Sequence, residues 1–264
     1  LNLFLHITGR RSDGYHDLQT LFQLLDWGDD MLFEANDSGQ VTLACEGIEI
    51  NSDDNLVMQA ARLLQQGSLG ARIQLRKRIP VGGGLGGGSS NAATTLLALN
   101  QLWDLKLDRS RLGQLGSSLG ADVPVFVGAR TAWAEGIGEI LVPVELPPRW
   151  YLILAPACHV STAEIFSHRQ LTRNTSPIRI AAFFEGHARN DCQELVRHLY
   201  PEVDKALKIL EKFGAAKLTG TGACVFTDFD TEAQARAAGK QLPTGWQGII
   251  ARGVNESPLE HDLT

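Results

Sequence analysis

The chain has 264 residues, which is enough for one large domain or two modest domains with hydrophobic cores. Hydrophobic residues make up 44% and charged residues 20%, a composition that indicates a globular protein rather than a disordered one. The formal net charge of −6 and the lack of a long basic run argue against a nucleic-acid partner. No apolar segment has the length of a membrane span, so we expect no membrane partner.

Four cysteines lie far apart and form no Cys-x-x-Cys pair: Cys45, Cys158, Cys192 and Cys224. This spacing favours reduced thiols in a cytoplasmic protein over a disulfide framework or a metal site. The seven histidines show no ligand spacing either, so we expect no metal ligands among them. We expect no signal peptide in the sequence. The first residue is Leu1 rather than methionine and it lies in an apolar segment, so we expect that a short piece before it is missing.

The first part of the chain predicts strands, a polar loop and one helix. Residues 1–7 alternate loosely and predict a strand, and residues 8–19 form a polar loop with adjacent tyrosine and histidine. Residues 31–34 and 41–45 predict the two strands of a hairpin. The helix that follows is expected to be capped by Asp53 or Asp54.

A glycine-rich stretch at residues 80–91 stands between a predicted strand and a predicted helix. Six of the seven positions 82–88 are glycine, and such a run disfavours order unless backbone N–H groups must converge where side chains would block them. Ser89 or Ser90 is expected to cap the helix that follows. The loop amides and the positive end of the helix dipole then form an anion site that suits phosphate.

Three other interpretations fit parts of this stretch. A flexible turn needs one or two glycines rather than six. Gly82, Gly84 and Gly87 satisfy the G-x-G-x-x-G pattern of dinucleotide-binding loops, but any glycine run contains it, and no acidic residue ends a second strand about 20 residues on. The spacing of a Walker loop is also present, but Ser89 stands where its lysine should be.

Asp122 is the second residue that the sequence singles out. It comes after a helix predicted at residues 108–119 and joins an apolar run at 123–127, so it cannot cap the helix before it. Aspartates are common in surface loops, but beside a phosphate loop a carboxylate that accepts a hydroxyl proton is the expected partner. The basic residues 76–78 fit a nucleotide's charge and a solvated strand end equally well.

The second half of the chain predicts a separate α/β unit. Residues 143–148 are the best linker candidate, and the boundary is placed between residues 147 and 148. Residues 156–171 are expected to form a loop. Strands are predicted within 131–144, at 150–155 and at 248–254, and helices at 178–184, 192–199, 202–213 and 232–242.

A second glycine loop is predicted at residues 218–226, between two short strands. By itself it indicates a bulged hairpin in which Thr219 and Thr221 are ordinary strand residues. Paired with the first glycine loop, it is also suited to close over a reacting phosphate.

These motifs together resemble a known group of proteins. Residues 80–92 look like the second motif of the small-molecule kinases that include galactokinase, homoserine kinase and mevalonate kinase, the GHMP kinases. Residues 218–224 resemble the third motif of that superfamily, and Asn2 resembles the end of its first motif. The group's sister members, which act on homoserine or a sugar, are one alternative for this chain.

One family within the group is similar along nearly the whole chain, the 4-diphosphocytidyl-2-C-methyl-D-erythritol kinases. The matching segments are residues 2–5, 9–16, 18–20, 120–124 and 190–191. The resemblance implies a two-domain α/β (α+β) GHMP-kinase-like fold with the active site in the inter-domain cleft. Residues 1–147 would form an N-terminal ATP-binding domain and residues 148–264 a ferredoxin-like, substrate-side C-terminal domain.

The resemblance also implies an activity, which is ATP-dependent phosphorylation of the 2-hydroxyl of a CDP-linked methylerythritol in the non-mevalonate isoprenoid pathway. The expected cofactors are ATP and Mg²⁺, the expected partner is the small-molecule substrate, and the expected assembly is a monomer or a homodimer. Alternatives from other classes are a nucleotide-binding module without catalysis and a dinucleotide oxidoreductase. Tyr15 and His16 argue against homoserine, because a small aliphatic substrate offers nothing to stack on.

Individual roles follow from the same resemblance. Asp122 matches the catalytic base, and Tyr15 and His16 match residues that hold the cytosine. Further substrate-side positions are Asn2, Thr162, Phe166 and Thr221. The residues that would hold the ATP phosphates are Pro80, Val81, Gly82, Gly83, Gly84, Leu85, Gly86, Gly87, Gly88, Ser89, Ser90 and Asn91. The family places a catalytic lysine immediately before the position of Leu1, and a protein that lacked it is expected to fold but to have greatly reduced activity.

Overall fold

The structure is a computed structural model that describes residues 1–46 and 55–262. The chain divides into two compact units, each assembled from three segments. Unit 1 contains Leu1–Trp27, Gly82–Leu85 and Thr131–Asn255, and unit 2 contains Gly28–Val81, Gly86–Arg130 and Glu256–Thr264. The predicted boundary at residues 147 and 148 falls inside unit 1, within its segment Thr131–Asn255.

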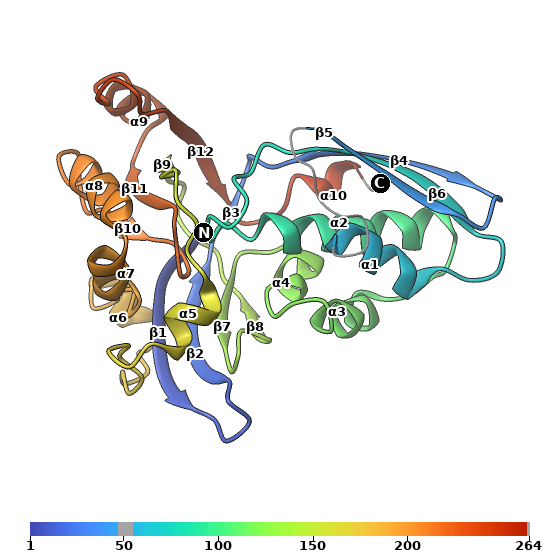
Figure 1. The fold of residues 1–264 in the computed structure, drawn as a ribbon, viewed down its shortest axis with the longest axis horizontal. Coiled ribbons are helices and arrows are strands. Elements are labelled where there is room, and N and C mark those ends of the chain that lie inside the picture. Colours follow the sequence, from blue (N-terminus) through green and yellow to red (C-terminus); the bar gives the residue numbers. More distant parts are fainter. Residues whose placement is uncertain (47–54, 263–264) are drawn as a thin grey trace. The chain divides into compact units, whose positions relative to one another are not determined.

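The first sheet of unit 1 is antiparallel and has the order β1-β2-β7-β8 (Figure 1). Its strands are β1 (Asn2–Arg10), β2 (His16–Phe22), β7 (Ala132–Glu135) and β8 (Ile140–Pro143). The strand predicted at residues 1–7 is confirmed, but it runs further, because Arg10 still pairs with His16. The polar loop predicted at residues 8–19 is therefore reduced to residues 11–15, and His16 lies on a strand.

The second sheet of unit 1 has the order β10-β11-β9-β12-β3. Its strands are β3 (Leu24–Leu25), β9 (Trp150–Leu154), β10 (Lys217–Leu218), β11 (Val225–Phe229) and β12 (Gly248–Val254). All neighbours pair antiparallel, and the four C-terminal strands follow the split βαβ order of ferredoxin-like folds.

The alternation of side chains along β9 builds the core of unit 1 on both faces of this sheet. Tyr151 and Ile153 pack with Phe4, Leu21 and Trp133 of the first sheet. Leu152 and Leu154 belong instead to a cluster that includes the buried faces of the helices. These helices are α5 (Thr162–Ser167), α7 (Gln193–Leu199), α8 (Pro201–Leu210) and α9 (Glu232–Gly239), and α6 (Ile180–Phe184) lies between α5 and α7 in the chain.

Helix α5 corrects the loop that the sequence predicts at residues 156–171. Ser161 caps it by accepting a hydrogen bond from the backbone N–H of Glu164, and Ile165 is fully buried. The helix is short and shows one buried apolar residue, which is too little for a periodic pattern to be recognised.

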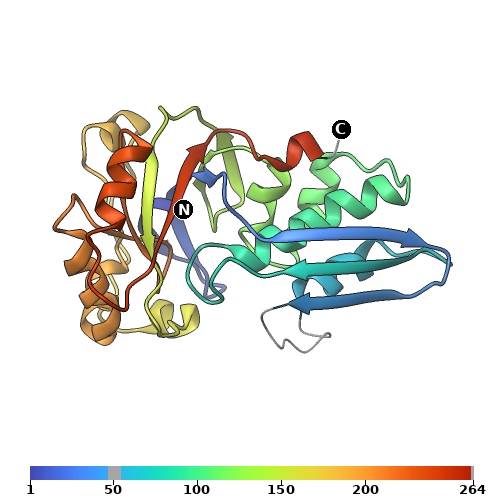
Figure 2. The same ribbon diagram turned by 90° about the horizontal axis from the view of Figure 1, so that it is seen from above.

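Unit 2 contains a three-stranded sheet in the order β4-β6-β5, seen from above in Figure 2. Its strands are β4 (Asp30–Asn36), β5 (Val41–Glu46) and β6 (Gly70–Arg76). The predicted hairpin of the two earlier strands is wrong, because β6 inserts between them and pairs antiparallel with β4 and parallel with β5. Ile73 and Leu75 on the central strand are fully buried, and this burial of apolar surface favours the central position of β6 in the sheet.

The helices of unit 2 are α1 (Leu56–Leu64), α2 (Gly87–Leu102), α3 (Arg109–Ser117), α4 (Val123–Gly128) and α10 (Leu259–Asp262). Helices α1 and α2 share one apolar cluster with β6 and lie against the sheet in Figure 1. Asn55 caps α1, whereas the caps predicted at Asp53 and Asp54 lie outside the described residues. The sequence did not predict α4, whose six residues look like a strand-length apolar run.

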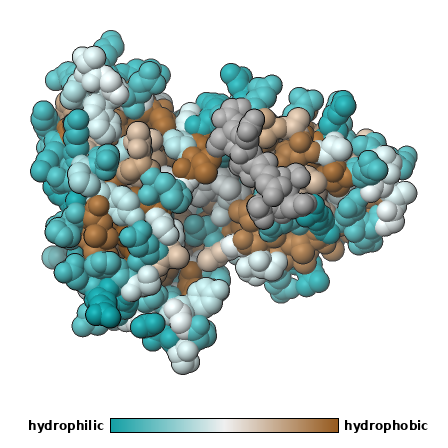
Figure 3. All heavy atoms as spheres, viewed as in Figure 1, coloured by the Kyte–Doolittle hydropathy of each residue, from teal (hydrophilic) through white to brown (hydrophobic). Residues whose placement is uncertain are grey.

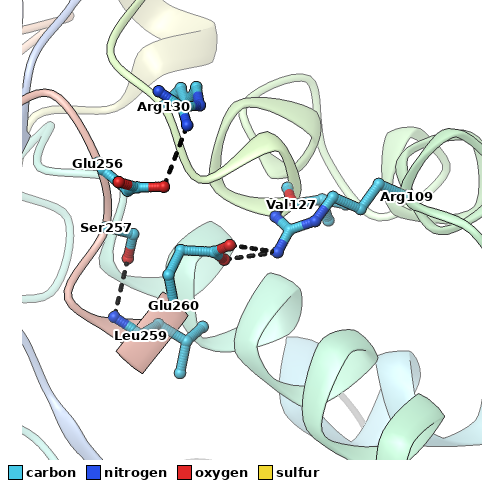
Figure 4. A network of polar contacts seen from close by, with 7 residues as sticks. All are labelled: Arg109, Val127, Arg130, Glu256, Ser257, Leu259 and Glu260. Atoms are coloured by element: carbon cyan, nitrogen blue, oxygen red, sulfur yellow. Dashed lines mark hydrogen bonds and ion pairs between the residues drawn. The ribbon is translucent and has the colours of Figure 1, made fainter. Parts of the chain in front are cut away.

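A polar network ties the C-terminal segment to α3 and α4 (Figure 4). Nη2 of Arg109 donates to both carboxylate oxygens of Glu260, at 2.5 and 2.7 Å, and Nη1 donates to the backbone oxygen of Val127 at 2.8 Å. Arg130 pairs with Glu256 at 3.1 Å. Arg109 at the start of α3 is thus joined both to the end of α4 and to the short helix α10.

The face seen in Figure 3 has hydrophilic residues interspersed with hydrophobic ones. Large exposed hydrophobic side chains of the described residues are scattered over several elements, for example Leu32 on β4, Ile140 on β8 and Phe184 on α6. None of the helices that the structure describes is both long enough and apolar enough to span a membrane.

Candidate active site

The glycine stretch becomes the start of a helix in unit 2. Helix α2 begins at Gly87, and Gly86 is its N-cap in the left-handed conformation, with φ of 66° and no side-chain capping bond. The predicted caps Ser89 and Ser90 are therefore wrong, since both lie in the first turn. The first N–H groups of any helix lack intrahelical partners, and three glycines leave them uncovered here, so this end can bind an anion.

Helix α4 packs against this end of α2. A β-carbon on Gly86 would lie 2.9 Å from the ring of Phe126, so the absence of a side chain permits the approach. A β-carbon on Gly120 would lie 3.7 Å from Oγ of Ser89. Asp122 comes two residues after Gly120, so the segment that carries it is adjacent to the first turn of α2 within unit 2.

Asp122 occupies the N-cap position of α4, with helical backbone angles and no side-chain capping bond. Its side chain is partly buried, and burial raises the pKa of the carboxyl group above its ordinary value. Above that pKa the carboxylate is poorly solvated, and its oxygens accept no hydrogen bond from the N–H groups at the start of α4. It can therefore accept a proton from a hydroxyl group.

The basic residues before the glycine stretch are not a solvated strand end throughout. The side chain of Lys77 is 8% exposed and that of Asp29 is 1% exposed, and the two form an ion pair. Asp29 also accepts hydrogen bonds from the backbone N–H groups of Arg78 at 2.6 Å and Ile79 at 2.8 Å. A β-carbon on Gly87 would lie 3.3 Å from Nζ of Lys77, so this buried cation stands beside the start of α2.

In unit 1 the second glycine loop packs on the beginning of the first. The backbone N–H of Cys224 donates to the oxygen of Gly83 at 3.0 Å, and Oγ1 of Thr219 donates to the oxygen of Gly84 at 3.1 Å. Gly84 has φ of 71°, and a β-carbon there would lie 2.5 Å from the oxygen of Thr219. The two loops are thus in direct contact within unit 1, and closure over a phosphate stays a prediction.

Several predicted substrate-side residues of unit 1 meet at this second loop. The backbone N–H of Asn2 donates to Oγ1 of Thr219 at 3.0 Å. The hydroxyl groups of Thr162 and Thr221 are 2.9 Å apart. Nδ2 of Asn190 donates to the oxygens of Leu218 at 2.9 Å and Gly220 at 2.8 Å. Asn190 was not among the predicted site residues, although the segment 190–191 matched the family pattern.

An aromatic group forms a second cluster of predicted residues in unit 1. The rings of His16 and Phe166 stack with centroids 5.2 Å apart and planes 29° apart. Tyr15 is 61% exposed, so its ring is open to a ligand. Arg173, which no sequence motif indicated, donates from Nε to Nε2 of His16 at 3.0 Å. The pKa of His16 lies below its ordinary value, because of burial first and then of the cations Arg173 and Arg10.

No group of three or more His, Cys, Asp or Glu side chains within residues 1–46 and 55–262 could hold a metal ion.

Comparisons with known proteins show the family to which the chain belongs. Residues 55–129 match the family model of the GHMP kinases N terminal domain, and residues 170–247 match that of the GHMP kinases C terminal domain. A protein of Alkalilimnicola ehrlichii named 4-diphosphocytidyl-2-C-methyl-D-erythritol kinase is 55% identical over 262 residues, covering 98% of this chain and 90% of that protein. A Pseudomonas aeruginosa protein of the same name is 55% identical over 266 residues, covering 100% of this chain and 94% of that protein.

Solved structures give the same result. A crystal structure of a 4-(cytidine 5'-diphospho)-2C-methyl-D-erythritol kinase has a TM-score of 0.82 at 33% identity, covering 96% of this chain and 97% of that one. A mevalonate kinase has a TM-score of 0.61 at 15% identity, covering 97% and 98% of the two chains, which shows a shared fold alone. The chain belongs to the 4-diphosphocytidyl-2-C-methyl-D-erythritol kinase family of the GHMP kinases.

Proposed function

We propose that the protein transfers the γ-phosphoryl group of ATP to the 2-hydroxyl of 4-diphosphocytidyl-2-C-methyl-D-erythritol, a step of the non-mevalonate isoprenoid pathway. The observation that carries the proposal is the stacked pair of His16 and Phe166, with the exposed side chain of Tyr15 one residue before His16 in the chain. A site of this kind suits a flat base such as cytosine and offers little to an aliphatic amino acid. Proteins of this name share about half their residues with this chain along its whole length.

The reaction needs positioning and charge neutralisation more than covalent help from the protein. The 2-hydroxyl oxygen attacks the γ-phosphorus, the bond from that phosphorus to the β,γ-bridging oxygen breaks, and ADP leaves. The hydroxyl proton passes to the carboxylate of Asp122. The amides at residues 80–91, with the start of α2, bind the phosphates of ATP.

Mg²⁺ would bind together with the phosphates of ATP and would supply charge neutralisation on the transferred group. The second glycine loop, with Thr162 and Thr221, lines the acceptor side together with Asn2. We also propose an ATP-binding part before residue 148 and a substrate-side part after it, to which Asn2, Tyr15 and His16 contribute from before that residue. The protein is proposed to function as a monomer or homodimer.

An assay that couples ADP release to a spectroscopic signal tests the proposal, with the protein made from its complete coding sequence. We expect turnover with the CDP-linked methylerythritol and none with homoserine or galactose. Turnover with homoserine or galactose alone would assign the protein to a sister activity. ATP binding without turnover of any of the three substrates would reduce it to a nucleotide-binding module.

A further inference from the structure

Arg173 makes four hydrogen bonds that join the aromatic cluster to the chain around it. Its Nε donates to Nε2 of His16 at 3.0 Å. Its Nη2 donates to the backbone oxygens of Phe166 at 2.7 Å and His168 at 2.8 Å, and its Nη1 donates to that of Leu171 at 3.1 Å. One guanidinium group therefore sets the position of the histidine ring and of the backbone that carries its stacking partner.

This contact fixes the protonation of His16. A guanidinium group has only donors and stays protonated, so Nε2 of His16 must be the acceptor. A neutral imidazole with a lone pair on Nε2 carries its hydrogen on Nδ1. A doubly protonated ring would bring two donors together, and the lowered pKa of His16, caused by burial and then by Arg173 and Arg10, disfavours that form as well.

The remaining nitrogen of His16 is available to a ligand. Among the residues that the structure describes, Nδ1 of His16 has no hydrogen-bond partner, and it is not one of the buried polar atoms left unsatisfied. The ring itself stacks on Phe166 and so cannot turn freely. The cluster thus presents a single N–H donor from a ring of fixed orientation.

A fixed donor distinguishes between pyrimidines. On the Watson–Crick edge of cytosine, N3 is an acceptor, whereas N3 of uracil carries a hydrogen and is a donor. An N–H of His16 that faces N3 is paired with cytosine and opposed by uracil. A buried donor left without a partner costs about 1–3 kcal/mol, which corresponds to roughly 5- to 150-fold.

We propose that Arg173 is a positioning residue that holds His16 as the Nδ1–H tautomer and thereby makes the site select cytosine over uracil. The inference rests on the proposed function, since it assigns the base of that substrate to the His16 cluster. Arg173 acts through His16 and does not itself touch the base.

The first test is ¹⁵N NMR of the histidine side chains in the free wild-type protein, with His16 assigned by comparison with His16→Asn. We expect His16 to be neutral at pH 7 with its hydrogen on Nδ1. In Arg173→Met the signal should shift toward a mixture of both tautomers, because the donor to Nε2 is gone. A hydrogen on Nε2 in the wild type overturns the proposal, and this readout needs no substrate.

The second test compares kcat/KM for the cytidyl substrate and for its uridyl analogue. We expect the wild type to prefer the cytidyl substrate by roughly 10- to 100-fold. Arg173→Met should lose most of this preference, chiefly through a higher KM for the cytidyl substrate. Arg173→Lys should recover part of it, because an ammonium group can still donate one hydrogen bond to Nε2.

Arg169→Met is the matched control, because Arg169 is exposed on the same segment and has no polar partner among the described residues. It should keep the wild-type preference. A folded Arg173→Met protein that keeps both the tautomer and the base preference overturns the proposal. If that variant does not fold, the proposal is tested by the wild-type protein alone, through the tautomer of His16 and the preference for the cytidyl substrate. Lack of wild-type turnover with the cytidyl substrate would instead refute the proposed function and leave the NMR result as the test of the tautomer.

Discussion

The contact between the two glycine loops gives a sharp prediction for Gly84→Ala. The added β-carbon would lie 2.5 Å from the oxygen of Thr219 and 2.8 Å from that of Gly222, both of which are backbone atoms that cannot rotate away. The backbone at Gly84 also has φ of 71°, which costs a residue with a β-carbon about 1–2 kcal/mol.

The loops must separate to relieve this clash. Separation breaks the hydrogen bonds from Thr219 to Gly84 and from Cys224 to Gly83, each worth about 1 kcal/mol. The sum is a loss of about 3–4 kcal/mol in the free energy of unfolding. For a chain of this size that corresponds to a melting temperature lower by roughly 6–16 °C.

Differential scanning calorimetry measures the effect, with Gly113→Ala as the control. A β-carbon at Gly113, inside α3, meets nothing within 4 Å, so this change should stabilise by about 0.5–1 kcal/mol. If Gly84→Ala melts within about 1 °C of the wild type, the contact between the loops is not as described and the reasoning fails.

Four further predictions concern activity and stability. Asp122→Asn should lower kcat by roughly 10²- to 10⁴-fold at nearly unchanged ATP affinity; unchanged turnover would mean another base. Burial raises the pKa of Asp122 in the folded state, so the protein loses stability as the pH rises and this carboxyl group ionises. At pH 8 the Asp122→Asn variant should therefore be more stable than the wild type in urea denaturation. Equal stability of the two proteins would contradict the burial argument. Gly86→Val should abolish measurable ATP binding in calorimetry, since its side chain must displace Phe126 and close the helix end; normal binding would remove the loop from the account. Arg109→Ala should destabilise the protein by about 1–2 kcal/mol in urea, through loss of the Glu260 pair and the bond to the Val127 oxygen, and Glu260→Gln by less; equal losses would mean that the carbonyl contact contributes nothing.

Local sequence signals predicted most elements of the fold. Alternation located β1 and β6, the strand predicted at residues 150–155 is β9, and the helical spacing after the glycine stretch located α2. The failures have a common physical cause. Residues 123–128 and 162–167 form helices too short to show a period, and their structure depends on neighbours distant in the sequence. The wrong hairpin has the same origin, because only tertiary pairing could place β6 between β4 and β5.

The residues of the candidate site also fall into those that the sequence indicated and those that it did not. The glycine run could be recognised from the sequence because so many glycines in one loop have few other uses. Asp122, Tyr15 and His16 were singled out by their place beside that loop and by the resemblance to the kinase family. The side chains that hold them were not visible. Arg173 is 157 positions from His16, and Asp29 is 48 positions from Lys77, so nothing local connects either pair. Ser89 and Ser90 were assigned as caps because serine favours that position, but Gly86 takes it with a left-handed backbone that only glycine adopts at low cost.

Phosphorus-31 NMR of the product tests the central claim most directly. The protein made from its complete coding sequence is incubated with ATP and 4-diphosphocytidyl-2-C-methyl-D-erythritol, and the spectrum is recorded until ATP is consumed. The account predicts ADP and one new phosphomonoester, bonded to the 2-carbon oxygen of the erythritol part, in equal amounts. Inorganic phosphate in place of that ester, or a phosphoryl group on any other hydroxyl, would contradict it.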